Sequence, residues 1–426
     1  MFSPLLHGPR TFKSTIYLFV FLIVLYLIYI ETTLPGYNRR LTTPPNHVSS
    51  SPSTAPPLAL KPTSPPAEPR ILLVSALFPL AKSKHSHEDY ENWLGKFLKS
   101  ITTPVYFYAP PSLSSMILSL RGSLPIYINT TFNSPFDISP LRGLENAYEH
   151  FHTIDREASY HNPELYAVWN AKPWLLDSAI KHLEEEKGEV YDYAFWNDAG
   201  SFRYDHVYTE WPNPSRVEEV WNIGVERVVE AGGFTESRGK MKNHLLFFPF
   251  TGMFGWAKRY WKEDDGPVDM DISEGSFFGG SPSTVSWWSE TYYIYHDYYL
   301  RKGYFVGKDQ TLINALFLLF PERVFGIWLD NPDATRIGIP GFDVGSMGKC
   351  GPPWWYYQWF LADGEERSVM SEKWLKDSND YKSWLWQGWE WWNQRQECRS
   401  TRVFWLKDKL LGVFGRGWTV NRNVIV

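Results

Sequence analysis

The chain has 426 residues, with 42 Lys and Arg against 47 Asp and Glu, a formal net charge of −5, and 43% hydrophobic residues. This composition is typical of globular proteins and excludes a chain that is disordered throughout. The mildly acidic balance, without a long basic run, predicts no nucleic-acid partner. Two cysteines are too few for a disulfide-dense scaffold or a cysteine-built zinc module, and the unusual feature is the 22 tryptophans.

Residues 14–30 form an apolar run without a formal charge. As a helix this run would reach about 25 Å, slightly less than the roughly 30 Å of a bilayer's hydrocarbon core. Such a short span suits the thinner membranes of the secretory pathway. We therefore expect a transmembrane anchor that follows a short cytoplasmic tail, residues 1–13. The alternative is a cleaved signal peptide, although residues 31–35 offer no good cleavage site.

Residues 31–70 are rich in Pro, Ser and Thr, which predicts an extended stem between the anchor and a folded body. This layout is that of a single-pass type II membrane protein with a luminal body, in the Golgi or the endoplasmic reticulum. In that setting Asn129, in the sequon Asn-Thr-Thr, would be glycosylated, and Cys350 would pair with Cys398. The alternatives are an unused sequon and two buried thiols.

The body begins with alternating strand and helix patterns. We expect strands at 71–76, 105–109 and 126–128, separated by helices at 89–101 and near 113–120. A helical pattern covers 163–186, where Pro173 either kinks the helix or starts its second half. Further strands are expected at 191–196, 245–250, 276–280 and 324–328, and helices at 285–301 and 311–320. This alternation indicates an α/β fold with a parallel sheet between helices.

The C-terminal part is rich in tryptophan, because residues 352–405 hold ten of the 22. Aromatic faces stack on sugar rings, but they also form ordinary core. We expect most of these side chains to be core and one or two to lie at the rim of a ligand site. The sequence thus divides into a main α/β domain at 71–340 and a Trp-rich extension at 341–426 that packs on it.

The strongest local signal for chemistry is Asp198, which follows a predicted strand in the segment Asn197-Asp198-Ala199-Gly200. Ligands of open α/β sheets bind at the carboxyl ends of strands, and a carboxylate there can meet a cation or a ligand hydroxyl. A structural role is the alternative, because Asp also caps turns and helices.

Three other positions carry weaker signals. Lys172, beside Pro173, could offer a positive charge to phosphate, or it could be a solvated residue on a helix face. The pair Gly279-Gly280 could let a backbone approach a ligand, or it could form a tight connection. Asp309 could bind a ligand or cap a helix. Nucleophile-elbow, phosphate-loop and zinc-protease motifs do not occur, so those enzyme classes lose support.

Five segments occur together in order: LYAVWNAKPW at 165–174, FWNDAGSFR at 195–203, WP at 211–212, FFGG at 277–280 and GKDQ at 307–310. The set resembles the HtrL/YibB family of glycosyltransferase-like proteins and covers roughly residues 71–328. The resemblance implies the GT-A fold, a Rossmann-like mixed sheet flanked by helices that binds nucleotide-diphospho-sugars. The Trp-rich extension lies outside it.

The resemblance also implies roles for residues. The strand with Ser75 would open the nucleotide-binding half, and Asn170, Lys172, Gly279, Gly280 and Gln310 would contact the donor. Asp198 stands where GT-A enzymes keep an Asp-x-Asp metal motif, but here only one carboxylate is present. Asp198 would therefore hold Mn²⁺ or Mg²⁺ with help from elsewhere, or Lys172 would replace the metal. Asp198 and Asp309 are the expected catalytic residues.

The expected reaction is transfer of a sugar from a nucleotide sugar to a hydroxyl of a glycan, glycoprotein or glycolipid, with stabilisation of the leaving diphosphate. The alternative is a non-catalytic carbohydrate-binding or interaction protein on a degenerate transferase fold, which the missing second Asp favours. A glycoside hydrolase ranks third, because it needs a second carboxylate that no motif supplies.

Overall fold

The computed structural model describes residues 68–80, 85–233, 237–328, 331, 353–380 and 402–424. The chain divides into two units, Met1–Pro65 and Pro66–Val426, and all described residues belong to the second unit. The predicted tail, anchor and most of the stem, the sequence 332–352 with Cys350, and the segment with Cys398 lie outside the described residues. Within the described part, no helix is both long and apolar enough to traverse a bilayer.

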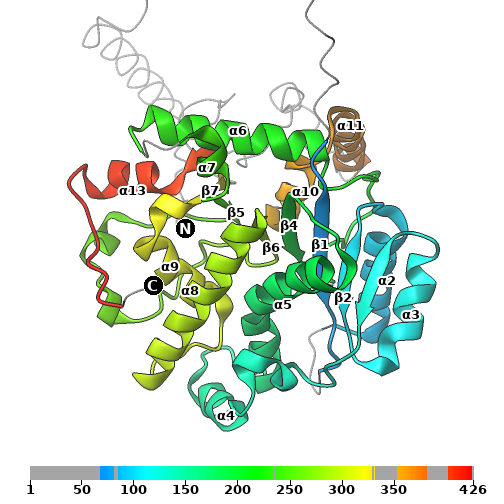
Figure 1. Cartoon of the computed structure of the whole chain (residues 1–426), viewed down its shortest axis with the longest axis horizontal. Coiled ribbons are helices and arrows are strands. Elements are labelled where there is room, and N and C mark those ends of the chain that lie inside the picture. Colours follow the sequence, from blue (N-terminus) through cyan, green and yellow to red (C-terminus); the bar gives the residue numbers. More distant parts are fainter. Residues whose placement is uncertain are drawn as a thin grey trace, which may run out of the picture. The chain divides into compact units, whose positions relative to one another are not determined.

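A single sheet of eight strands runs through the second unit in the order β3-β2-β1-β4-β6-β5-β7-β8 (Figure 1). Its strands are, in chain order, β1 (Ile71–Ala76), β2 (Val105–Tyr108), β3 (Ile126–Asn129), β4 (Tyr193–Asn197), β5 (Leu246–Phe250), β6 (Phe277–Gly280), β7 (Val324–Trp328) and β8 (Val403–Trp405). Strands β3, β2, β1 and β4 are parallel, whereas β6 and β8 run antiparallel to their neighbours. The sheet is therefore mixed, as the family resemblance implied.

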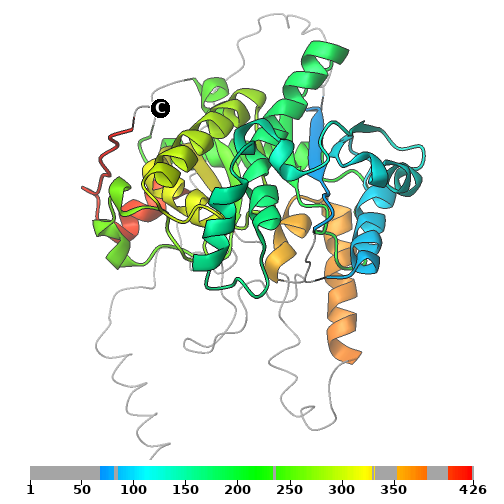
Figure 2. The same ribbon diagram turned by 90° about the horizontal axis from the view of Figure 1, so that it is seen from below.

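Helices cover both faces of the sheet. The larger ones are α2 (His87–Ser100), α3 (Pro111–Arg121), α4 (Glu145–Ile154), α5 (Pro163–Lys187), α6 (Pro214–Glu230), α8 (Pro282–Arg301), α9 (Asp309–Leu319), α11 (Gly364–Asp380) and α13 (Leu406–Phe414). Alternate residues of β1 enter two separate cores: Leu72 and Val74 pack with α5 and α8, whereas Ile71 and Leu73 pack with α2 and α6. Figures 1 and 2 show α5 beside α8.

Local sequence explains where the site-bearing helices begin. Helix α5 starts with Asn162, whose side chain accepts from the Leu165 N–H, and it ends at Gly188 in the left-handed conformation (φ 65°). Pro173 lies inside α5, which continues through it as one helix. Helix α8 starts with Ser281, whose side chain accepts from the Thr284 N–H, and Pro282 occupies its first position.

The C-terminal segment contributes to the sheet itself. Strand β8 pairs with β7, and α13 follows directly. The short helix α10 (Tyr356–Phe360) is buried, and the Tyr356 hydroxyl donates to the carbonyl groups of Phe250 and Ile327 (2.8 Å each). Trp359 and Trp405 are core, as expected, whereas Trp354 is exposed and the tryptophans between 384 and 392 lie outside the described residues.

Candidate active site

A cavity of about 700 Å³ opens at the carboxyl ends of β1 and β4, the edge where open α/β sheets bind ligands. Its walls come from the loop after β1, the first turns of α2 and α3, the helix α5 with the loop before it, and the loop after β4. Many of the lining side chains are aromatic: Tyr90, Tyr160, Trp169, Trp196 and Trp355.

Asp198 lies at the floor of this cavity, directly after β4. Its backbone N–H donates to the Ser276 carbonyl (2.9 Å), which fixes the loop against the residue that precedes β6. Its carboxylate accepts from the Trp196 indole N–H (2.6 Å). One third of the side chain is exposed, so this carboxylate can meet a ligand in the cavity.

Lys172 reaches Asp198 from α5. Its Nζ lies 3.2 Å from the Asp198 Oδ1 and 3.1 Å from the Asp309 Oδ2, and it donates to the Gly275 carbonyl (3.0 Å). Only 5% of the side chain is exposed, so the alternative of a solvated lysine on a helix face is wrong. Burial alone would lower the pKa of Lys172, but the two carboxylates outweigh burial and hold the pKa above its ordinary value.

Asp309 and Gln310 support the floor from the start of α9. Asp309 is the first residue of that helix and is buried; the residue in the cap position is Lys308, which makes no side-chain cap. Burial raises the pKa of the Asp309 carboxyl, although Lys172 opposes the rise. The Gln310 side chain donates to the Ser273 carbonyl (2.9 Å). Neither residue lines the cavity; Asp309 contacts Lys172, and Gln310 contacts the loop before β6.

Asn170 and Ser75 are buried beneath the cavity. The Asn170 amide donates to the carbonyl groups of Val306 and Gly307 (3.0 Å each) and accepts from the Tyr292 hydroxyl (2.6 Å). Asn170 therefore ties α5 to the loop that leads into α9. The Ser75 hydroxyl is fully buried in β1 and has no hydrogen-bond partner among the described residues. Neither side chain lines the cavity.

Gly279 and Gly280 lie in β6, away from the cavity. The pairing of Ala194 with Gly280 and of Asn197 with Phe277 directs the end of β6 toward the opposite edge of the sheet from Asp198. A Cβ built on Gly279 would lie 2.1 Å from the Ala194 carbonyl oxygen. Gly279 thus permits the close approach of β4 and β6. This is a role in backbone packing, and ligand contact is not needed to explain the glycine.

Two residues near Asp198 were not singled out from the sequence. Glu274, before β6, is buried, and burial raises the pKa of its carboxyl to about 7, with Asp198 adding to the rise. Arg203 lines the cavity, with its guanidinium carbon 4.3 Å from the Trp93 ring centre and 5.3 Å from that of Trp355. Arg203 is the last residue of the motif at 195–203. Its place in that motif was the one sequence feature that could have identified it as a candidate.

The floor fits an ion pair better than a divalent cation. Such a cation needs carboxylate oxygens that are free to coordinate it. The Asp198 oxygens already face Lys172 and the Trp196 indole, and the ammonium group of Lys172 would repel a cation at this position. The residues present therefore do not form a Mn²⁺ or Mg²⁺ site around Asp198.

A second group of ligand-type side chains lies partly at the cavity wall, which Glu157 and His161 line. Asp155, Glu157 and His161 bring one ligand atom each within 4.8 Å of one another. The Asp155 Oδ2 lies 2.7 Å from the His161 Nδ1 and accepts from the Tyr166 hydroxyl (2.6 Å). These contacts account for the arrangement as a hydrogen-bonded cluster that supports the loop before α5.

Asn129 ends β3, an edge strand of the sheet. Its side-chain nitrogen donates to the Tyr106 hydroxyl (3.0 Å), and its side-chain oxygen accepts from the Thr131 N–H (2.9 Å). Glycosylation of Asn129 stays a prediction.

No protein-family profile matches the chain, and no curated protein matches it. Several solved structures are similar to it in part, among them the following two. The apo form of mouse xyloside xylosyltransferase 1 has 10% sequence identity and a TM-score of 0.33 over 61% of this chain and 84% of that protein. Core-mannan synthase A from Aspergillus fumigatus, in a Mn/GDP form, has 11% identity and a TM-score of 0.35 over 69% of this chain and 84% of that protein.

Proposed function

We propose that this chain is a glycosyltransferase that moves a sugar from a nucleotide-sugar donor to a hydroxyl acceptor. The observation that carries the proposal is Asp198, a partly exposed carboxylate on the floor of a cavity of about 700 Å³ at the carboxyl end of β4. A carboxylate binds sugar hydroxyls, and the surrounding aromatic rings can stack on a sugar or a base.

The reaction breaks the bond between the anomeric carbon and the diphosphate, which leaves as the nucleoside diphosphate with the bonding electron pair. A new bond forms to the acceptor oxygen, whose proton passes to the departing phosphate or to water. Asp198 accepts a hydrogen bond from a sugar hydroxyl, while Lys172 and Trp196 hold the carboxylate in one orientation. Arg203, at the wall, supplies a positive charge that can meet the leaving diphosphate. Charge stabilisation in this scheme comes from the side chains of the protein.

The order of the five motifs supports a relationship to the HtrL/YibB family, and the likeness covers the elements from β1 to β7. The apolar run at 14–30 supports a type II anchor with the body in the lumen of the Golgi or the endoplasmic reticulum. In that compartment the acceptor is a hydroxyl of a glycan, glycoprotein or glycolipid.

One observation favours a second candidate, a carbohydrate-binding protein without turnover. Lys172 forms an ion pair with Asp198. A transferase that uses a metal would need this carboxylate to be free to coordinate the cation. A site of this kind can bind sugar hydroxyls and aromatic-stacked rings without activating a leaving group.

The test is an assay of the full-length chain with a panel of nucleotide sugars, a mixture of glycan acceptors, and either Mn²⁺ or a chelator. We expect release of nucleotide from one donor, loss of at least 100-fold of this activity in Asp198→Asn, and activity that persists with the chelator. The matched control is Asp408→Asn, which changes an exposed carboxylate on α13, far from the cavity lining. Saturable glycan binding without nucleotide release from any donor would support the second candidate.

A further inference from the structure

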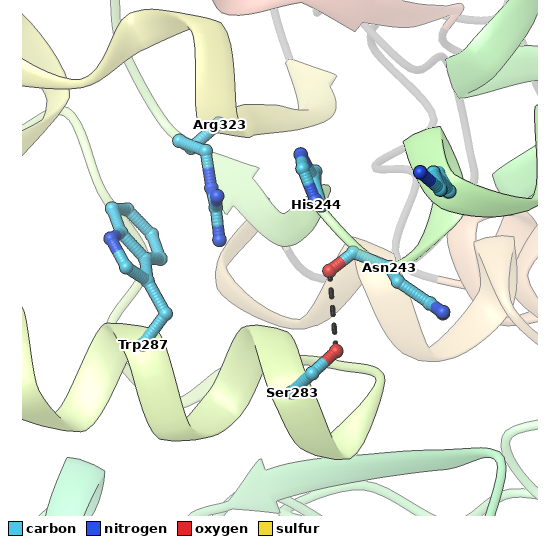
Figure 3. Close-up of a pocket in the computed structure, with 6 residues that line it drawn as sticks. Asn243, His244, Ser283, Trp287 and Arg323 are labelled. Atoms are coloured by element: carbon cyan, nitrogen blue, oxygen red, sulfur yellow. Dashed lines mark hydrogen bonds between the residues drawn. The ribbon is translucent and has the colours of Figure 1, made fainter. Parts of the chain in front are cut away.

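A second cavity, of about 470 Å³, lies at the opposite edge of the sheet from Asp198. Its lining residues come from places where β5 and β7 begin and where β6 ends: Asn243 and His244 precede β5, Arg323 precedes β7, and Ser283 follows β6. Because β5 and β7 are parallel and β6 is antiparallel to them, these three strand ends meet at one edge. Figure 3 shows how Asn243, His244, Ser283, Trp287 and Arg323 lie in this cavity.

The lining of this cavity is basic. Lys240 from α7 (Arg238–Lys242), His244 and Arg323 contribute nitrogen groups, and no carboxylate is among the lining residues in the described part of the chain. Glu322, next to Arg323 in the sequence, forms an ion pair with Arg422 (3.1 Å), and its effect on the pKa of Arg323 is smaller than that of burial. The cavity therefore presents the positive charges of Lys240 and Arg323 to a ligand.

Arg323 is the central group. Its guanidinium carbon lies 4.0 Å from the centre of the Trp287 ring, and Figure 3 shows the side chain extended between Trp287 and His244. Its buried Nε has no hydrogen-bond partner among the described residues. Burial lowers the pKa of Arg323 to about 10, which leaves it charged at neutral pH. A buried charged donor without an acceptor costs free energy that a bound anion would recover.

The start of α8 adds to this preference. Ser283 lies in the first turn of that helix, and its hydroxyl donates to the Asn243 carbonyl at 3.4 Å, a long hydrogen bond (Figure 3). The positive end of the helix dipole, in a helix of 20 residues, points toward the same cavity edge. The N-terminus of α8, the guanidinium group of Arg323 and the ammonium group of Lys240 thus all favour a negatively charged ligand.

We infer that this cavity binds a tetrahedral oxyanion, a phosphate or sulfate group. The planar donor fork of Arg323 suits two oxygens of such a group, while Lys240 supplies a second charge. The cavity is several times larger than one oxyanion, so an ester, with its organic part against Trp287, fits the space better than a free ion. This site is separate from Asp198 and does not depend on the proposed transferase activity.

Calorimetric titration of the full-length chain at low ionic strength tests the inference. Inorganic phosphate, glycerol 3-phosphate and a sulfated monosaccharide are titrated separately, with sodium chloride at equal ionic strength as the blank. We expect saturable binding of at least one oxyanion and an affinity at least tenfold lower in both Arg323→Gln and Lys240→Gln. Lys99→Gln, which removes an exposed charge on α2, is expected to bind as the unaltered chain does.

The two variants separate binding from folding. Lys240 is exposed, so Lys240→Gln should keep the melting temperature of the unaltered chain even if Arg323→Gln lowers it. Tighter binding of an ester than of inorganic phosphate supports the inference and identifies a substituted ligand as the occupant. An absence of saturable binding of all three anions would overturn it, as would equal affinity in Lys240→Gln and the unaltered chain.

Discussion

Lys172 holds two carboxylates that would otherwise be incompatible with burial. Asp309 is almost fully buried and Asp198 is two-thirds buried, and both lie within 3.2 Å of the same ammonium group. We expect Lys172→Met to lower the free energy of unfolding by about 3 kcal/mol at pH 7, because removing one partner leaves a buried charge unpaired. Urea denaturation followed by tryptophan fluorescence measures the change.

The pH dependence of this variant provides its internal check. Without Lys172, burial raises the pKa of Asp309 without opposition, so the folded state takes up a proton more readily than the unfolded state. Stability of the variant should therefore recover as the pH is lowered from 7 to 5. A loss of stability that is the same at both pH values would show that packing of the lysine stem, and not its charge, is what matters. Lys99→Met serves as the control for an exposed lysine.

Glu274 predicts a pH effect in the unaltered chain. Burial raises the pKa of its carboxyl to about 7, from its ordinary value of 4.5 in the unfolded state. Between these values the folded state keeps a proton that the unfolded state has released, so stability falls as the pH rises from about 4.5 to 7. The change amounts to about 3 kcal/mol for this one group.

The isosteric variant Glu274→Gln isolates that contribution, since its side-chain oxygen can still accept from the Ser276 N–H. We expect the variant to match the unaltered chain near pH 5 and to exceed it in stability at pH 8. Denaturation midpoints measured at both values decide the matter. Parallel pH profiles of the two proteins would mean that Glu274 is not the group responsible.

At the scale of elements, the sequence predicted the strands and helices from β1 to β7 well, because each buried apolar run is bounded by polar or turn residues. The run at 71–76 is β1. The strand expected at 191–196 is β4, which begins two residues later, at Tyr193. Helices α4, α6 and α7 were missed, although the buried Val217, Val220 and Trp221 of α6 follow a helical period. Strand β8 could not have been read, because three apolar residues define no period.

The site was predictable only in part, for a physical reason. Asp198 was identified from its place after a strand, which is a local property of the sequence. The contact of Lys172 with Asp309 joins α5 to α9 across 137 positions and depends on how the two helices pack. Burial of Glu274 follows from the same packing. Sequence patterns indicate which residues are available, whereas the fold decides which of them meet.

Substitution of Gly279 tests how closely β4 and β6 are packed in the sheet. A methyl group there would meet the Ala194 carbonyl at 2.1 Å and the Phe195 Cα at 2.8 Å, and backbone atoms cannot move aside as a flexible side chain can. We expect Gly279→Ala to lower the free energy of unfolding by about 3 kcal/mol. In Gly412→Ala, on α13, the added Cβ meets nothing within 4 Å, so stability should be unchanged or slightly higher. Thermal unfolding of both variants provides the comparison, and equal melting temperatures would refute the packing argument.

At the scale of the whole molecule, the C-terminal segment completes the body that carries the site. Phe404, Leu406, Leu410 and Phe414 belong to the same core as α8 and α9, and the Phe404 ring lies 5.0 Å from that of Phe250. The cavity around Asp198 also takes Trp355 from this segment as part of its wall. The body that carries the candidate site therefore cannot be equated with the part of the chain that carries the five motifs.

A chain that stops at residue 401 tests this conclusion. This chain lacks β8 and α13, so β7 becomes an unpaired edge strand. It also loses the burial of four apolar side chains, and each of them contributes about 2 kcal/mol to the free energy of unfolding. That loss approaches the whole stability of a typical domain, so we expect aggregation or unfolding at 25 °C. Size-exclusion chromatography and circular dichroism measure the outcome beside a chain that stops at residue 424. A truncated chain that stays monomeric, with the melting temperature of the longer one, would show instead that β1 to β7 and their helices fold without β8, and that the C-terminal strand is an addition to a body already complete.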